Sequence, residues 1–391
     1  MAARQKLALC TLMSAAFAAG GAVGQDMKAL EKRVKALEKA GGGQTVLRSK
    51  KTMSLTLSGH VNRAVQFRDN GTESGFLHVT TNLSRTRVRW IAKGKISDDL
   101  TAATKIELGN QSSSSSAQDL GDNGDDGVNG AGVLDERHID LTISSKTLGK
   151  LWMGQGATAS EDTSEYDLSG TGVATLNGDF ASLAGGEAFQ LSNGTAQGRT
   201  IGNVFSNFDG AGRRDRVRYD TTKFAGFNLA VAHHNADSWD LGLHYGGSIG
   251  SVKIAAGLGY VDDTTRNFNK TINGSLSVLL PMGLSLTLGA ADRDSDLVAG
   301  GREPDWRYGK IGYRFKAFEL GETRVAAEYS QVEDLAAVGE EGAYYGVAVV
   351  QIVETLGSEL YLSYHNADLD VAGGADPEDI DVVTAGARFK F

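Results

Sequence analysis

The chain has 391 residues, including 51 Gly, 3 Pro and one Cys, and its formal net charge is −9 at pH 7. With so little Pro and no G-X-Y period, the glycine excess does not indicate a collagen. It indicates many tight turns or closely approaching backbones. A hydrophobic content of 41% is sufficient for a folded chain, and the acidic net charge argues against nucleic acid as a partner.

Residues 1–24 have the pattern of a secretory signal peptide. A basic start is followed by an apolar core over residues 7–16 and then by small residues, which is the usual order in such signals. Cleavage after Gly24 is favoured over cleavage after Ala18, because it leaves a polar new N-terminus. Cys10 is removed with the signal, so the exported chain has no disulfide and no thiol chemistry.

A short periplasmic helix is predicted next, within residues 25–43, and a run of three glycines at 41–43 forms a hinge after it. The apolar residues of this helix fall at the a and d positions of two heptads: Met27, Leu30, Val34 and Leu37. Two heptads are too few for a stable isolated helix. The segment therefore either forms a small coiled coil of three tethered copies or is a frayed amphipathic leader.

From residue 44 onwards the sequence predicts β-strands. Apolar and polar residues alternate in segments of about ten residues. Sixteen such segments lie near residues 52–68, 84–96, 100–109, 136–145, 149–156, 213–222, 226–235, 239–247, 251–261, 270–280, 283–293, 305–316, 322–333, 343–353, 357–367 and 379–391. Short and long connections alternate, and the longest covers residues 157–212. Tight turns at one end and long loops at the other are typical of an outer-membrane barrel.

The two strand faces separate a membrane barrel from a soluble β-sandwich. After residue 24 no run approaches the ~18 apolar residues of a spanning helix, but a barrel crosses a membrane without one. The apolar faces carry aromatic residues at strand ends, such as Tyr219 and Phe389, as membrane interfaces require. The polar faces carry small residues such as Asn273, Ser275 and Ser277, which favour an open, water-filled lumen.

Basic residues occupy alternate positions on one face of two predicted strands. They are Arg85, Arg87, Arg89 and Lys93 on the first, and Arg214, Arg216 and Arg218 on the second. Like charges at this spacing repel one another unless water or nearby acids compensate them. Because a water-filled channel would supply that compensation, we predict that these seven residues form a basic wall of a pore. An exposed basic strand face on a soluble protein is the alternative.

Four ordered segments resemble the trimeric general porins of Gram-negative outer membranes. These segments are Ser54–Asn62, Ser84–Val88 with Lys95–Ala102, Arg137–Leu141 with Leu148–Gln155, and the terminal Gly386–Phe391. They are similar to the family's first strand, its second and third strands with their turn, its fourth and fifth strands, and its last strand. The chain departs from the family at its N-terminal helix and at Asp140, where an aromatic residue is commoner.

The resemblance implies an all-β fold, a 16-stranded antiparallel transmembrane β-barrel over residues 44–391, with the short N-terminal coiled-coil helix outside it. It also implies a homotrimer in the cell outer membrane, in contact with lipid and lipopolysaccharide. The barrel-assembly machinery would recognise Phe391 as the assembly signal. Glycines inside strands, such as Gly242, Gly257 and Gly259, are expected at bends or where subunits approach closely.

The resemblance also gives the longest loop a role. In the family, the loop after the fifth strand folds into the barrel, so the loop 157–212 is expected to narrow the channel. Its constriction acids would be Glu161, Asp162, Glu165 and Asp167, facing the basic wall. Opposed charges across a narrow aqueous opening would orient dipolar solutes.

The predicted function is an outer-membrane porin, a passive diffusion channel for small hydrophilic solutes and ions. A structural or adhesive outer-membrane barrel with a closed lumen is the alternative. The exported chain has no HExxH motif and no cysteine nucleophile, so we predict no enzyme and no catalytic residue. Its histidines lack the spacing of metal ligands, and neither a metal site nor a cofactor is predicted.

Overall fold

The computed structural model describes residues 45–50, 53–110, 112–121, 134–234, 237–263, 270–294 and 302–391. The chain divides into two compact units, Met1–Gly42 and Gly43–Phe391, and the described residues belong to the second. The predicted signal peptide and the predicted helix of residues 25–43, with Met27, Leu30, Val34 and Leu37, lie outside the described residues. Among the described residues no helix is both long and apolar enough to cross a membrane.

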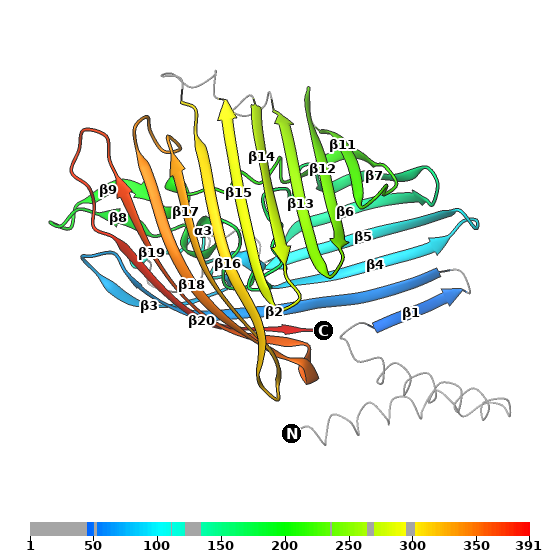
Figure 1. Ribbon diagram of the computed structural model, residues 1–391, viewed down its shortest axis with the longest axis horizontal. Coiled ribbons are helices and arrows are strands. Elements are labelled where there is room, and N and C mark those ends of the chain that lie inside the picture. Colours follow the sequence, from blue (N-terminus) through cyan, green and yellow to red (C-terminus); the bar gives the residue numbers. More distant parts are fainter. Residues whose placement is uncertain are drawn as a thin grey trace. The chain divides into compact units, whose positions relative to one another are not determined.

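The described strands form one antiparallel sheet of 18 strands that closes on itself (Figure 1). They are β1 (Thr45–Lys50), β2 (Met53–Asp69), β3 (Ser74–Val79), β4 (Arg87–Lys95), β5 (Leu100–Asn110), β6 (Leu134–Ser145), β7 (Gly149–Ala157), β10 (Arg213–Asp220), β11 (Phe227–His234), β12 (Ser238–Ile249), β13 (Val252–Asp262), β14 (Lys270–Leu279), β15 (Leu284–Asp294), β16 (Asp305–Phe318), β17 (Gly321–Glu333), β18 (Glu341–Val353), β19 (Ser358–Asp370) and β20 (Ile380–Lys390). Sixteen of these described strands, β2, β4 to β7 and β10 to β20, form the ring, which β20 closes by pairing with β2. The predicted 16-stranded barrel is confirmed.

Two short strands that the sequence did not predict complete the pairing of β2. This strand of 17 residues is longer than either neighbour: β4 pairs with residues 53–60 and β20 with residues 60–69. Strand β1 pairs with the start of β2, beyond the end of β20, and β3 pairs with its end, beyond the reach of β4. Each short strand therefore bonds backbone groups that would otherwise lie on a free edge.

The alternation along the strands produces the two faces that the sequence predicts. On β2, Val61 is 47% exposed, whereas Asn62 is fully buried. On β14, Ile272 and Leu276 are exposed, whereas Ser275 is buried. The large apolar side chains thus point away from the interior of the ring, and the polar ones point into it. This is the arrangement of a membrane barrel, whereas a soluble β-sandwich buries its apolar face in the core.

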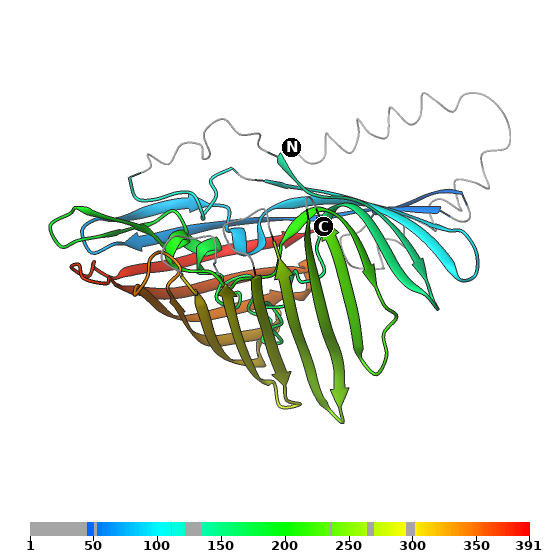
Figure 2. The same ribbon diagram turned by 90° about the horizontal axis from the view of Figure 1, so that it is seen from above.

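The long connection between β7 and β10 folds into the interior of the ring (Figure 2). We call residues 158–212 the inner loop. It contains α3 (Phe180–Ala184), α4 (Ile201–Val204) and a hairpin of β8 (Ala188–Gln190) and β9 (Ala196–Thr200). Helix α3 begins where the carboxylate of Asp179 accepts a hydrogen bond from the backbone N–H of Ser182 at 3.1 Å, so this acid caps the helix. Two single 3₁₀ turns, η1 (Asn82–Ser84) and η2 (Glu354–Leu356), lie elsewhere in the chain.

The largest apolar core lies between the inner loop and the barrel wall. The ring of Phe180 lies 4.8 Å from that of Tyr344 on β18 and 5.7 Å from that of Phe205, which follows α4. Trp306 of β16 and Phe208 of the loop are buried in the same cluster. Because this core fixes the loop against the long-loop ends of β16 and β18, the loop is a packed element of the structure.

Strand glycines make room for the inner loop. A Cβ on Gly242 would lie 2.0 Å from the carbonyl oxygen of Ala159, and a Cβ on Gly259 would lie 2.5 Å from Oγ1 of Thr163. A Cβ on Gly257 would lie 2.8 Å from Cα of Thr163. The close approach at these glycines is therefore between the wall and the inner loop of one chain.

Candidate functional site

Side chains of the barrel wall hold the inner loop in place. The carboxylate of Asp240 on β12 accepts hydrogen bonds from the N–H and the hydroxyl of Ser160, both at 2.6 Å. The amide of Asn273 on β14 donates to the carbonyl of Phe208 at 2.5 Å. Lys310 on β16 donates to the carbonyl of Thr175 at 2.7 Å. Three strands thus fix the path of the loop across the lumen.

The small polar residues of β14 serve this attachment. Asn273, Ser275 and Ser277 were expected to face an open lumen, but they are buried beneath the loop. The hydroxyls of Ser275 and Ser277 accept hydrogen bonds from the backbone N–H groups of Tyr166 at 2.9 Å and Leu168 at 2.8 Å. Their small size lets the loop backbone approach the wall, which is why the interpretation as open-lumen residues is wrong.

A polar cavity of about 640 Å³ remains between the inner loop and the opposite wall. Its lining includes six arginines and six acids. The arginines are Arg85, Arg87, Arg137, Arg213, Arg324 and Arg388, and the acids are Glu161, Asp162, Glu165, Asp179, Asp209 and Glu359. All of these acids except Glu359 belong to the inner loop, whereas none of the arginines does. Arg324 reaches the loop, where it donates to the carbonyl of Gly170 at 3.2 Å. Opposite charges therefore face each other across the cavity.

The cavity brings together only part of the predicted basic wall. Arg85 and Arg87 line it, whereas Arg89 and Lys93 of the same strand are not part of its lining. The row on β10 is also outside the lining, and each of its members has an acidic partner: Arg214 with Asp263 at 3.0 Å, Arg216 with Asp140 at 3.1 Å, and Arg218 with Asp220 at 2.7 Å. Each arginine of the β10 row therefore has its charge compensated by an acid of the wall or its loops.

Three of the four predicted loop acids line the cavity, namely Glu161, Asp162 and Glu165. Glu161 pairs with Arg213 at 2.5 Å. The fourth, Asp167, points to the wall instead, where its carboxylate lies 3.0 Å from Nζ of Lys310. Burial alone would raise the pKa of Asp167, but the charge of Lys310 and the bonds from Ser169 outweigh burial and hold that pKa below its usual value.

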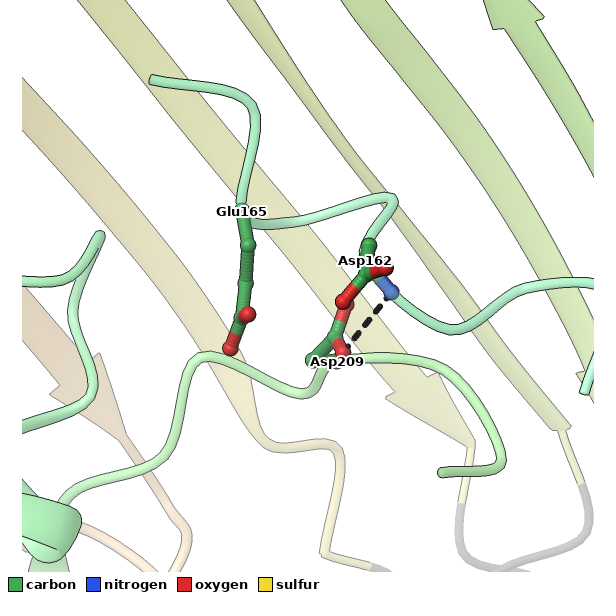
Figure 3. A group of neighbouring side chains, drawn as sticks. All are labelled: Asp162, Glu165 and Asp209. Atoms are coloured by element: carbon green, nitrogen blue, oxygen red, sulfur yellow. Dashed lines mark hydrogen bonds between the residues drawn. The ribbon is translucent and has the colours of Figure 1, made fainter. Parts of the chain in front are cut away.

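Three acids of the loop lie together without a basic partner among the described residues. The oxygens of Asp162, Glu165 and Asp209 lie within 4.8 Å of one another (Figure 3). Burial, followed by the charges of the neighbouring carboxylates, raises the pKa of Glu165 and of Asp209 well above their usual values. Three such oxygens could contact a hard cation, but Ca²⁺ takes six to eight oxygen ligands, so the group supplies only part of a metal site.

One buried acid pairs with three arginines of the wall. The carboxylate of Glu107 on β5 pairs with Arg87 at 3.4 Å, with Arg137 at 2.8 Å and also with Arg89. Glu107 has no exposed surface. Since one negative charge faces three positive ones, this part of the wall keeps an excess of positive charge.

The family comparison decides what kind of barrel this is. A model of the Gram-negative porin family matches residues 10–372. The chain belongs to the Gram-negative porin family. No curated protein sequence matches the chain.

Several solved porin structures share the fold. An anion-selective porin from Comamonas acidovorans is 18% identical with a TM-score of 0.57, and the match covers 87% of this chain and 100% of that one. OmpF of Salmonella typhi, in a complex with daunomycin, is 10% identical with a TM-score of 0.55, over 89% and 100%. A loop L8 deletion mutant of OmpT from Vibrio cholerae is 16% identical with a TM-score of 0.54, over 87% and 100%. Identities this low establish a shared fold.

This porin is an outer-membrane channel, as the sequence resemblance predicted. Its cavity contains residues that the sequence reasoning missed. Arg324 and Arg388 come from distant strands, and neither belongs to a row of three basic residues like those on which the predicted basic wall was based. Arg137 was missed because a bulge in β6, opposite Glu107 and Leu108, places both Arg137 and His138 inside, whereas strict alternation would place only one of them there.

Proposed function

We propose that this porin is a passive, homotrimeric diffusion channel for small hydrophilic solutes and ions, with its narrowest passage at the cavity between the inner loop and the arginine wall. The observation that carries the proposal is the loop itself. It is packed into the barrel by a hydrophobic core and by wall hydrogen bonds, yet the space beside it is polar and lined by opposed charges. Such a passage favours hydrated, charged or dipolar solutes.

In this proposal, Arg85 and Arg87 contribute to the basic side and Glu161, Asp162 and Glu165 to the acidic side. Nothing in this passage calls for a nucleophile, a cofactor or a metal, and we propose no enzymatic activity. The alternative of a structural or adhesive barrel with a closed lumen requires that the cavity does not lead through the protein.

Planar-bilayer recording of the purified porin tests the proposal. Current steps in groups of three would support a homotrimer of conducting barrels. A protein that inserts into the bilayer but carries no current would contradict the diffusion channel and favour the closed barrel. Chemical cross-linking in detergent gives an independent measure of the subunit number.

The ends of the chain have proposed roles of their own. We propose that residues 1–24 are removed as a signal peptide and that residues 25–43 form a periplasmic coiled coil. The mass of the mature protein tests the first proposal, and the helical content of a peptide of residues 25–43, alone and fused to a trimeric carrier, tests the second.

Phe391 closes the barrel and is proposed as the signal for the assembly machinery. Its backbone N–H donates to the carbonyl of Gly59 at 3.0 Å, and the N–H of Gly59 donates to the carbonyl of Phe391 at 2.9 Å. Deletion of Phe391 should reduce the amount of assembled porin in the outer membrane, among its lipids and lipopolysaccharide, whereas Phe389→Leu on the same strand should reduce it less.

A further inference from the structure

Three lysines of the wall have no acidic partner. Lys93 lies on β4, Lys105 on β5 and Lys150 on β7, and we call them the lysine track. In the described part of the chain, no hydrogen bond or ion pair joins their ammonium groups to a carboxylate. Unpaired ammonium groups in a row are unusual beside arginines that pair with Glu107, Asp140 and Asp220, so they require an explanation.

The lysine track faces the lumen. Lys93 lies four residues after Arg89 on β4 and therefore on the same face, and Arg89 pairs with the buried Glu107. Lys105 lies two residues before Glu107 on β5 and therefore shares its face. Nζ of Lys150 lies 3.2 Å from the centroid of the Trp152 ring, and Nε1 of Trp152 donates to Asp220 at 2.8 Å.

The acids nearest to the track are already engaged by arginines. Asp140 lies directly opposite Lys105 in the pairing of β5 and β6, but its carboxylate is 3.1 Å from Arg216. Asp220 lies opposite Lys150 in the pairing of β7 and β10, but its carboxylate is 2.7 Å from Arg218. Glu107 is shared by three arginines. The positive charge of the track is therefore uncompensated by the wall around it.

The lysine track extends away from the arginine-lined cavity towards the short turns. Lys93 follows Arg87, which lines the cavity, by six residues along β4, or about 20 Å of extended strand. Lys150 lies directly after the short turn of residues 146–148. Lys93 pairs with Ala103, so Lys105 is its diagonal neighbour, at about 7–8 Å between backbones. The track thus continues the positive side of the constriction to one mouth of the barrel.

We propose that the lysine track attracts small anions, of the carboxylate, phosphate or halide class, along this wall and makes the channel favour anions over cations. The proposal rests on the proposed function, because it assigns a sign of ion selectivity to the same passage. At about 7 Å in water, one unit charge raises the local concentration of a monovalent anion by about threefold and lowers that of a monovalent cation by the same factor. Three such charges lie along one path where the neighbouring acids Asp140 and Asp220 are engaged by arginines, so they add their fields along it.

The reversal potential in a KCl gradient tests the track. We expect a chloride-to-potassium permeability ratio above one for the natural protein between about 0.01 and about 0.1 M KCl, where the screening length is about 30 to about 10 Å. The variant Lys93→Gln/Lys105→Gln/Lys150→Gln should lower that ratio severalfold for each lysine removed. The difference should vanish near about 1 M KCl, where screening is nearly complete. Conductance in potassium acetate and in potassium phosphate should fall in the same variant.

Lys270→Gln is the matched control. Lys270 is exposed on β14 and alternates with the buried Thr271, so it lies on the outer face and its loss should leave the ratio unchanged. Assembly of each variant is checked by cross-linking and by heat-dependent mobility. A natural protein that conducts, with a ratio that the triple variant does not change, overturns the lysine track alone. A natural protein that does not conduct overturns the proposed function and the track with it.

Discussion

The carboxylate of Glu107 on β5 lies 2.8 Å from Nε of Arg137 on the neighbouring strand β6. The contact exists because a bulge in β6 rotates Arg137 into the lumen beside His138. Arg87 and Arg89 reach the same carboxylate from β4. Glu107 therefore sets both the positions and the net charge of the arginines on one side of the passage.

Substitution of Glu107 by Gln should strengthen the preference for anions. The three guanidiniums would keep their charges without the shared counter-charge, and at low salt we expect a severalfold increase in the chloride-to-potassium permeability ratio. Loss of one partner of a buried pair should also lower the stability of the folded barrel by about 3–5 kcal/mol. Reversal potentials and thermal unfolding in detergent measure the two effects.

Glu328→Gln is the control that separates a change in ion selectivity from a loss of stability. Glu328 is a buried acid of β17 that pairs with His365 at 3.2 Å and does not line the cavity. Its variant should lose stability without a change in ion selectivity. An equal change of selectivity in both variants would contradict the role of Glu107.

Asp240→Asn should loosen the start of the inner loop. The carboxylate of Asp240 accepts two hydrogen bonds from Ser160, and hydrogen bonds to a charged acceptor contribute about 1.5–3 kcal/mol each. We expect noisier single-channel currents and faster entry of larger neutral sugars into porin-containing liposomes. Ser160→Ala, which removes only the hydroxyl bond, should give a smaller effect. Quiet currents and unchanged sugar entry in Asp240→Asn would show that other contacts suffice to fix the loop.

Phe180→Ala should detach the middle of the inner loop from the wall. The ring of Phe180 is 2% exposed and packs on Tyr344 and Phe205, and truncation of such a ring costs about 3–5 kcal/mol. A loop that leaves the wall should change the single-channel conductance, while the strand pairing of the ring persists in circular dichroism. Phe227→Ala is the control, because Phe227 lies on the outer face and is 46% exposed. Equal conductance in the two variants would contradict the packing role of Phe180.

Acidification should raise the preference for anions. Burial is the main cause that raises the pKa of Glu161 to about 6, with Asp162 adding to it and Arg213 opposing it. Burial also raises the pKa values of Glu165 and Asp209. A carboxyl with a raised pKa loses its negative charge as the pH falls through the raised value, while the facing arginines stay charged. The chloride-to-potassium ratio should therefore rise as the pH falls from about 7 to about 5.

The variant Glu161→Gln/Glu165→Gln/Asp209→Asn isolates the contribution of the carboxyls. The natural protein alone does not separate these carboxyls from other groups that titrate in the same range. The variant should have a higher ratio at about pH 7 and a flatter pH dependence. A variant that keeps the full pH dependence would contradict the role of these three carboxyls.

Much of the fold could be predicted from the sequence, because each strand face repeats every second residue. The alternation of Val61 with Asn62 is enough to show which side of β2 meets the membrane. The same rule misplaces Arg137, because a bulge adds one residue to the count and leaves no signature in the local pattern.

The cavity was predicted less completely than the barrel. Asp167 is an acid at the place in the loop where a constriction acid is expected. Its partner Lys310, however, is 143 residues away along the chain. Such a contact depends on the path of the inner loop across the lumen, and that path is set by the packing of Phe180 and Phe208 on the wall. Local sequence patterns do not specify it.

The junction between β2 and β20 has a consequence for biosynthesis. The backbone bonds between Gly59 and Phe391 join the first strand of the ring to the last residue of the chain. Contacts between segments so far apart in sequence form slowly, and here they are available only when translation is complete. A nascent or prematurely terminated chain therefore carries two open sheet edges, which can pair with other chains, and its solubility before assembly depends on keeping those edges apart.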